Sequence, residues 1–178
     1  MITKDDLIAF SKGKKKGFDK IYEAYSPGMY SICLRYLNSE DDAKDALQDA
    51  FIKVYNHRST YKIELPIGAW IKTITIRCAL SILKERNKFE SFDEMKINSN
   101  PLEIEIEESD HDLKKSLELA LKKLPDGYRT VFNLFAIDNL THKEIASYLS
   151  ITEGTSKSQY SKAKAFLQKL LQSEKLAS

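Results

Sequence analysis

The feature that most constrains this chain is a short helical pattern, a three-residue turn and a longer helical pattern near its end. Thr141 and Glu144 have the spacing of a capping box, which opens the short helix. The turn is Ser150-Ile151-Thr152, and the second helix begins near Glu153. Three apolar residues are expected to fill the corner between the helices: Ile145, Leu149 and Ile151. This order predicts a helix-turn-helix.

The first half of the longer helix is polar and cationic. Its side chains there are Thr155, Ser156, Lys157, Ser158, Gln159, Ser161, Lys162 and Lys164. Lysine neutralises phosphates, while serine, threonine and glutamine can hydrogen-bond base edges in the major groove. The pattern favours DNA recognition over the alternative, a four-helix packing whose last helix has a solvated basic face. Ser150 stands at a turn position where glycine is common, because the backbone there tends to be left-handed.

The rest of the sequence also has helical periodicity, and only six glycines and four prolines occur among the 178 residues. We therefore expect an all-α protein. Capping-box spacings and a proline mark three predicted helix starts: Thr3 with Asp6, Ser39 with Asp42, and Pro66. Ser26-Pro27 predicts that a helix begun at Phe18 ends there and that another starts.

Charge divides the chain into three parts. Residues 1–88 have 16 basic and 11 acidic side chains, for a net charge of +5. Residues 89–112 have one basic and nine acidic side chains, and residues 113–178 have 11 basic and six acidic ones. Two basic blocks joined by an acidic strip predict two helical domains, 1–88 and 113–178, and a flexible linker over 89–112.

Several classes of protein are disfavoured. No apolar run is long enough to cross a bilayer, and the first residues have no signal-peptide core. Cys33 and Cys78 do not form a Cys-x-x-Cys pair, so two buried thiols in a reducing compartment are expected. The three histidines are scattered, without metal-ligand spacing. We expect a cytoplasmic protein that is not an enzyme, has no cofactor and is not inserted in a membrane.

Two sets of motifs occur in order, one in each basic block. The second block has Leu124-Pro125-Asp126-Gly127-Tyr128, Leu140-Thr141-His142-Lys143-Glu144 and Glu153-Gly154-Thr155-Ser156-Lys157-Ser158. The first block has Tyr25-Ser26-Pro27, Leu47-Gln48-Asp49-Ala50-Phe51 and Ala69-Trp70-Ile71. These motifs resemble the extracytoplasmic-function (ECF) group of bacterial sigma-70 factors, over nearly all of the chain outside the linker. The resemblance implies a protein that binds core RNA polymerase, directs it to a promoter and catalyses nothing itself.

By this resemblance, the first domain docks on the clamp helices of the largest polymerase subunit. Acidic and amide side chains lie on or near one face of the helix expected over residues 43–55. They offer hydrogen-bond acceptors to a cationic partner. The expected polymerase-binding residues are Asp42, Asp45, Gln48, Asp49 and Phe51. For Phe51 two interpretations stay open: an apolar contact at the margin of this face, or a core residue. Promoter DNA and an anti-sigma protein are the other partners that the resemblance implies.

The resemblance also implies that the first domain opens the -10 element of the promoter. Residues 60–67 and the helix from Trp70 would form a pocket for an unpaired base, on which Tyr61 could stack. Trp70 has the spacing of a core residue, and Arg77 stands where the family often has asparagine. The expected -10 contacts are Tyr61, Lys62, Lys72, Arg77, Lys84, Arg86 and Lys88.

The second domain would read the -35 element as duplex DNA. Ser156 stands where the family commonly has valine, and Gln159 replaces a common arginine. Because glutamine pairs with adenine edges, the base preference is expected to differ from that of relatives. The expected -35 contacts are Thr155, Lys157, Ser158, Gln159, Ser161 and Lys162.

The acidic linker has two interpretations. By resemblance it would thread the polymerase near its active centre, and the alternative is a solvated tether.

Two other functions stay open for the whole chain. A stand-alone helix-turn-helix regulator, with an N-terminal dimerisation or sensing module, would bind specific DNA without polymerase. A helical adaptor for an acidic protein would show no salt-dependent binding to nucleic acid.

Overall fold

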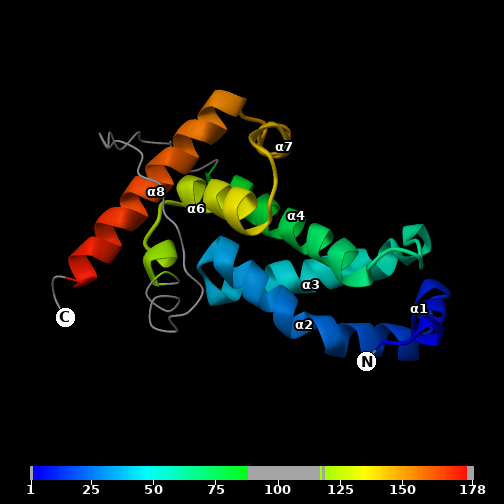
Figure 1. The fold of residues 1–178 in the computed structure, drawn as a ribbon. Helices are drawn as coiled ribbons and strands as arrows, with labels where there is room; N and C mark the ends of the chain where they lie inside the picture. The colour runs from blue at the N-terminus through cyan, green and yellow to red at the C-terminus, as the bar shows by residue number, and fades with distance from the viewer. Residues whose placement is uncertain (1, 88–116, 118, 176–178) are drawn as a thin grey trace. The chain divides into compact units, whose positions relative to one another are not determined.

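The computed structural model of the chain describes residues 2–87, 117 and 119–175, and every regular element among them is helical (Figure 1). The predicted all-α fold class is confirmed. The chain divides into two compact units, residues 1–92 and 93–178, which we call the N-terminal and C-terminal units. The predicted linker over 89–112 lies outside the described residues, so the domain bounds 1–88 and 113–178 stay predictions.

The described part of the N-terminal unit is built from four α-helices and a short 3-10 helix. They are α1 (Lys4–Ser11), α2 (Lys15–Leu37), α3 (Glu40–Asn56), η1 (Arg58–Thr60) and α4 (Ile67–Asn87). Helices α2, α3 and α4 pack against one another, and α1 packs on α2 (Figure 1). Large side chains from all four helices and from the segment after η1 share one core: Phe10, Ile21, Met29, Phe51, Val54, Tyr61, Ile67 and Ile71.

Side-chain caps explain where α1 and α3 begin. The Thr3 hydroxyl accepts a hydrogen bond from the Asp6 N–H at 3.3 Å, and the Asp6 carboxylate accepts from the Thr3 N–H at 3.0 Å. This is the predicted capping box. Ser39 accepts from the Asp42 N–H at 3.3 Å. The Asp42 carboxylate, however, accepts from Nη1 of Arg86 at 3.0 Å, which ties the start of α3 to the end of α4.

The predicted helix break at Ser26-Pro27 is wrong, because α2 runs through Pro27. Proline lacks the N–H that would donate to the carbonyl of Glu23, and inside a helix it costs about 3 kcal/mol. Both Glu23 and Pro27 are exposed, so water can bond that carbonyl. Ile21 and Met29, which lie before and after the proline, are both buried in the core. Their burial holds the two halves in one helix.

The described part of the C-terminal unit consists of shorter helices packed on one long helix. Residues 119–122 are helical and are followed by α6 (Asp126–Phe132), the π-helical segment η2 (Asn133–Ile137), α7 (His142–Leu149) and α8 (Glu153–Lys175). Both α6 and α7 pack on α8. The core of this unit contains Ala120, Leu121, Leu124, Phe132, Ala163 and Leu167. Buried Arg129 donates to the Leu124 carbonyl at 2.7 Å and pairs with Asp126, which joins α6 to the preceding turn.

Helices α7 and α8 form the predicted helix-turn-helix. Thr141 and Glu144 make the predicted capping box at the start of α7. Ser150 adopts the left-handed conformation expected at its turn position, with a φ of 58°. The hydroxyl of Thr152 accepts from the Thr155 N–H at 3.0 Å and so caps α8. Local hydrogen bonds therefore determine where the second helix starts.

The two cysteines are free and buried, as predicted, with Cys33 on α2 and Cys78 on α4. Burial raises the pKa of the Cys33 thiol to about 12. Burial also raises the pKa of Cys78, although Nζ of Lys53 lies 3.5 Å from its sulfur. Both thiols therefore stay protonated inside the helical core.

Candidate functional site

An apolar groove lies between α2 and α3 of the N-terminal unit, with a volume of about 820 Å³. Its lining residues are Lys15, Phe18, Asp19, Tyr22, Lys44, Leu47, Gln48, Phe51, Ile52, Tyr55 and Asn56. The ring centroids of Phe18 and Tyr55 are 5.3 Å apart and those of Tyr22 and Phe51 are 4.8 Å apart, both edge to face. Tyr22 is 44% exposed and Ile52 is 50% exposed. The groove thus exposes apolar surface to solvent.

Two of the five predicted polymerase-binding residues, Gln48 and Phe51, line this groove, and Asp42 instead pairs with Arg86. Asp45, Gln48 and Asp49 are exposed, and Gln48 lines the groove. Phe51 is only 3% exposed and forms part of the groove wall from within the core. Hydrogen-bond acceptors and an apolar surface therefore occur side by side on one helix.

Three groove residues are not predicted by the helical periodicity: Tyr22, Ile52 and Tyr55. For the two that lie on α3, Ile52 and Tyr55, the sequence does hold a signal. This helix has one stripe of small buried residues that faces the core. That stripe is Ala43, Ala46, Ala50 and Val54. The helix has a second apolar stripe that includes Leu47, Ile52 and Tyr55. A helix that needs one buried face but carries two apolar stripes has a surface left for a partner.

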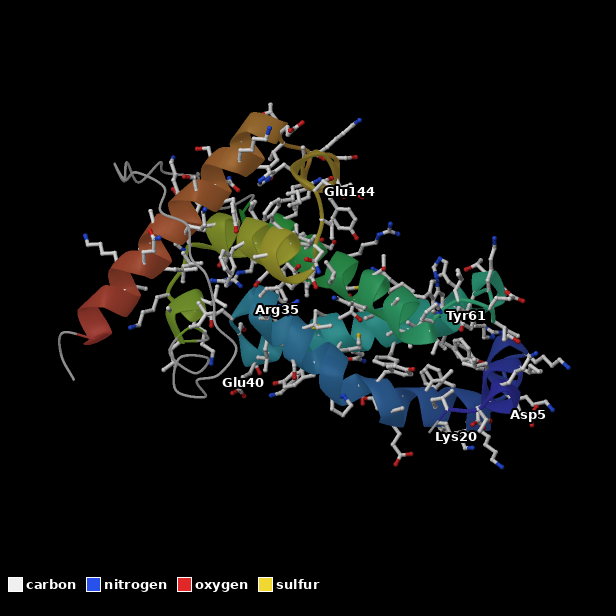
Figure 2. The ribbon with its side chains drawn as sticks, viewed as in Figure 1. Asp5, Lys20, Arg35, Glu40, Tyr61 and Glu144 are labelled. Carbon is white, nitrogen blue, oxygen red and sulfur yellow. The ribbon has the colours of Figure 1, made fainter. Side chains whose placement is uncertain are left out.

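The segment after η1 holds Tyr61, the predicted stacking residue, inside the core (Figure 2). Its ring centroid lies 5.3 Å from that of Trp70 and 6.5 Å from that of Phe10. Its hydroxyl donates to the Leu65 carbonyl at 2.6 Å, and burial raises the pKa of this hydroxyl. Tyr61 is 6% exposed. Its stacking role stays a prediction, and that role requires the segment to open.

The predicted cationic -10 contacts differ in their surroundings. Lys62, Arg77 and Lys84 are exposed, and Lys72 is half-buried. Lys88 lies outside the described residues. Arg86 donates to the Leu37 carbonyl at 3.3 Å in addition to its ion pair with Asp42. A phosphate that binds Arg86 must therefore compete with a carboxylate of the same unit.

The first turns of α8 carry the predicted -35 contacts. Thr155, Lys157 and Ser158 are exposed, while Gln159, Ser161 and Lys162 are half-buried. Nζ of Lys157 forms an ion pair with Glu153 at 2.7 Å. Polar and cationic side chains thus stand on the surface of a capped second helix, the arrangement that enters a major groove in helix-turn-helix proteins.

His142 links the two helices of the helix-turn-helix. Its Nδ1 lies 2.9 Å from the hydroxyl of Ser156, which is fully buried. The imidazole stacks on Phe135 with 4.2 Å between centroids and meets the Tyr160 ring at 5.8 Å. Burial and nearby Lys157 lower the pKa of His142. The serine at the position of a common valine thus has a polar partner that its own helix does not supply.

Metal ligands and membrane spans are both absent from the described part of the chain. No three His, Cys, Asp or Glu side chains converge there to hold a metal ion. His57 and His142 belong to different units. None of the helices in residues 2–87, 117 and 119–175 has both the length and the apolar character that a bilayer requires.

Two family sequence models match the chain in succession. The family described as Sigma-70 region 2 matches residues 21–89. The family described as Sigma-70, region 4 matches residues 114–167. The first match contains most of the residues that line the α2–α3 groove and the segment before α4. The second contains α7 and the first part of α8.

Curated relatives are similar over most of their length. The ECF RNA polymerase sigma factor SigW of Bacillus subtilis (strain 168) is 26% identical over 182 residues, covering 96% of this chain and 97% of that protein. The ECF RNA polymerase sigma-E factor of Escherichia coli (strain K12) is 26% identical over 167 residues, covering 86% of this chain and 85% of that protein.

Two solved structures share the fold. The sigma factor RpoE, solved in complex with the anti-sigma factor NepR from Bartonella quintana, has a TM-score of 0.55 at 21% identity. That similarity covers 88% of this chain and 98% of the other. CnrH, solved in complex with the cytosolic domain of CnrY, has a TM-score of 0.53 at 18% identity, over 97% of this chain and 99% of the other.

Proposed function

We propose a division of labour for this chain, which belongs to the extracytoplasmic-function group of the sigma-70 family: its N-terminal unit binds polymerase and the -10 element, and its C-terminal unit reads the -35 element. The protein is a sigma factor, not an enzyme, and directs RNA polymerase to promoters, where transcription starts. It binds core RNA polymerase and promoter DNA. We infer that it acts in the cytoplasm, because its polymerase and its promoters are there.

The α2–α3 groove supports polymerase docking on the N-terminal unit. Exposed Tyr22 and Ile52 offer apolar anchoring surface, and Asp45, Gln48 and Asp49 add acceptors on the same helix as Ile52. A helical partner that combines apolar side chains with arginine or lysine matches this surface. We assign that role to the clamp helices of the largest polymerase subunit.

Different features support the two promoter contacts. The start of α8 exposes Lys157 and Ser158, which suits duplex DNA. The segment before α4 contains an aromatic ring, Tyr61, next to exposed Lys62. An aromatic ring beside a cation is suited to a base that has left the duplex stack and to its phosphate.

An anti-sigma protein is the regulator that we propose. One structure with the same fold is a sigma factor bound to such a protein. The groove, with exposed Tyr22 and Ile52, is a surface that a regulator could cover in competition with polymerase.

One observation carries the proposal: a region 2 unit with an open, acceptor-flanked groove and a region 4 unit with a capped second helix occur in one chain in the family's order. The test is a pull-down with purified core RNA polymerase, followed by run-off transcription from a randomised promoter library. Gln48→Ala/Ile52→Ala should weaken polymerase binding. Lys157→Ala/Lys162→Ala should keep it and lose only the -35 preference. Lys169→Ala, an exposed lysine later on α8, is the matched control.

The same assay distinguishes the alternatives. Specific duplex binding with no polymerase binding would favour a stand-alone regulator. Binding of an acidic protein, with no salt-dependent binding to nucleic acid, would favour a helical adaptor.

A further inference from the structure

The turn between α1 and α2 is a concentrated basic surface. Residues 12–16, which we call the basic turn, are four exposed lysines and one glycine in the order Lys-Gly-Lys-Lys-Lys. Gly13 has a φ of +73°, which glycine adopts without strain. Lys15 pairs with Asp19 at 2.7 Å. Within the part of the chain that the structure describes, Lys12, Lys14 and Lys16 have no ion-pair partner.

The basic turn lies beside the segment that we assign to the -10 element. A Cβ on Gly13 would lie 2.9 Å from Nε of Arg58, so the turn touches η1. A Cβ on Gly17 would lie 2.4 Å from the backbone nitrogen of Phe10, which shows how closely α1 approaches α2. The Phe10 ring in turn lies beside Tyr61. Figure 2 shows Tyr61 at the same end of the unit as Asp5 of α1.

Two further cations add to the charge at this end. Nη1 of Arg58 donates to the Tyr55 carbonyl at 2.7 Å, and the guanidinium lies 4.3 Å from the centre of the Tyr55 ring. Arg58 is therefore held in place beside the basic turn. Lys62, at the start of the segment before α4, is exposed.

The nearby carboxylates do not cancel this charge. Asp6 is engaged by Lys20 at 2.7 Å and by the Thr3 backbone. Asp19 is engaged by Lys15. Asp5 and Glu64 are exposed. These two exposed carboxylates are outnumbered by five cationic side chains: Lys12, Lys14, Lys16, Arg58 and Lys62.

We propose that the basic turn binds phosphates of the promoter strand that flanks the -10 element. This inference rests on the proposed -10 role of residues 60–67, because the turn touches η1 at the edge of that segment. Phosphate contacts position DNA without reading its sequence. The turn thus increases affinity for the opened promoter and leaves the base preference unchanged.

The side chains of the turn favour a nucleic acid over an acidic protein. Protein–protein hot spots are built from large anchors such as tryptophan, tyrosine and arginine. The basic turn offers only lysine and glycine, and lysine acts on phosphate as a compact point charge. Lys15, which pairs with Asp19 and also lines the groove, is left unchanged in the test below.

The test uses holoenzyme assembled from core polymerase and the full chain, with or without Lys12→Gln/Lys14→Gln/Lys16→Gln. Binding is measured to fork-junction DNA that has a single-stranded -10 element and no -35 element, between about 50 and 200 mM salt. The logarithm of the affinity falls linearly with the logarithm of the salt concentration. Loss of three phosphate contacts should make this negative slope shallower by about 2. The discrimination between -10 bases should not change. Lys122→Gln/Lys123→Gln/Lys169→Gln removes the same charge from the C-terminal unit and should behave as wild type.

Three results would count against the inference. Equal salt slopes for the triple variant and the wild type, with base discrimination intact, would overturn it and leave the proposed function standing. Weaker pull-down of core polymerase by the triple variant would assign the turn to a protein contact. A wild-type holoenzyme without any -10 base discrimination would overturn the proposed role of residues 60–67, and the inference with it.

Discussion

The segment before α4 and the start of α8 are assigned to two parts of one promoter, but they are built in opposite ways. On α8, Lys157 and Ser158 are exposed on a helix that Thr152 caps. In the segment before α4, Tyr61 is 6% exposed and hydrogen-bonded to the Leu65 carbonyl. A preformed site binds at little cost, whereas a closed site must first lose its own contacts. We infer that strand opening at -10 is coupled to a change in the N-terminal unit, while -35 binding needs none in α8.

The largest expected effect comes from Tyr61→Ala, which removes a core ring. The free energy of unfolding of the N-terminal unit should fall by about 3 kcal/mol or more. Tyr61→Phe keeps the ring, loses the hydrogen bond to Leu65 and should cost about 1 kcal/mol. Lys157→Ala, on exposed α8, should change stability by less than about 0.5 kcal/mol. Trp70, the single tryptophan, reports on the N-terminal unit through its fluorescence in a denaturant titration.

The contrast between a closed -10 site and an exposed -35 site would be wrong if Tyr61→Ala had the same unfolding midpoint in denaturant as the wild type. That result would mean that the ring already lies outside the core in solution.

The next effect is on the support of α8. Ser156→Ala leaves Nδ1 of His142 without its partner and should destabilise the C-terminal unit by about 1 kcal/mol. In a protein that already carries His142→Phe, adding Ser156→Ala should reduce stability much less, because the hydrogen-bond partner is already absent. Hydrogen exchange of α7 and α8 amides measures both. Additive effects of the two substitutions would show that the 2.9 Å contact contributes nothing.

A pH dependence follows from the lowered pKa of His142. The unfolded chain, with a histidine pKa of 6.5, binds the proton more readily than the folded unit does. The contribution of His142 to stability is therefore present above pH 6.5 and is lost as the pH falls below it. Glu144 and Glu153 also have lowered pKa values, so their contribution is lost only below pH 4.5.

The measurement is exchange of C-terminal-unit amides at about pH 7.5 and about pH 5.5, corrected for the intrinsic rate. Wild type should lose protection on acidification, and His142→Phe should lose less. The same loss in both proteins would indicate that His142 is solvated.

The smallest expected effect concerns the ion pair between Lys157 and Glu153. Both side chains are about half exposed, so the pair contributes little to stability. Glu153→Gln releases the lysine and should strengthen binding to -35 duplex by about twofold to fivefold. The gain should shrink as salt is added, and fluorescence anisotropy can follow it. A loss of affinity would show that Glu153 orients Lys157 for DNA.

Local hydrogen bonding explains what could be predicted from the sequence. The capping box of Thr141 and Glu144 and the left-handed Ser150 depend on residues close in the chain, and both were expected. They define the helix-turn-helix and, with the helical periodicity, the all-α fold. The two sets of motifs, one in each basic block, predicted the family.

Contacts between distant residues explain what could not be predicted. Pro27 continues a helix because Ile21 and Met29 are buried on either side of it. Tyr61 is buried because Phe10, about fifty residues earlier, packs beside it. An aromatic stripe has the same spacing whether another helix covers it or not, so the exposure of Tyr22 followed only from the three-dimensional packing.

The buried thiols make this protein convenient for fluorescent labelling. Thiol-reactive dyes attack the thiolate, and both Cys33 and Cys78 are buried with raised pKa values. Since the chain has no other cysteine, the folded protein should react slowly with maleimides. A cysteine introduced at Ile52 or at Ser158 would then carry the only dye. Changes in its emission would report separately on events at the groove and on events at the -35 surface.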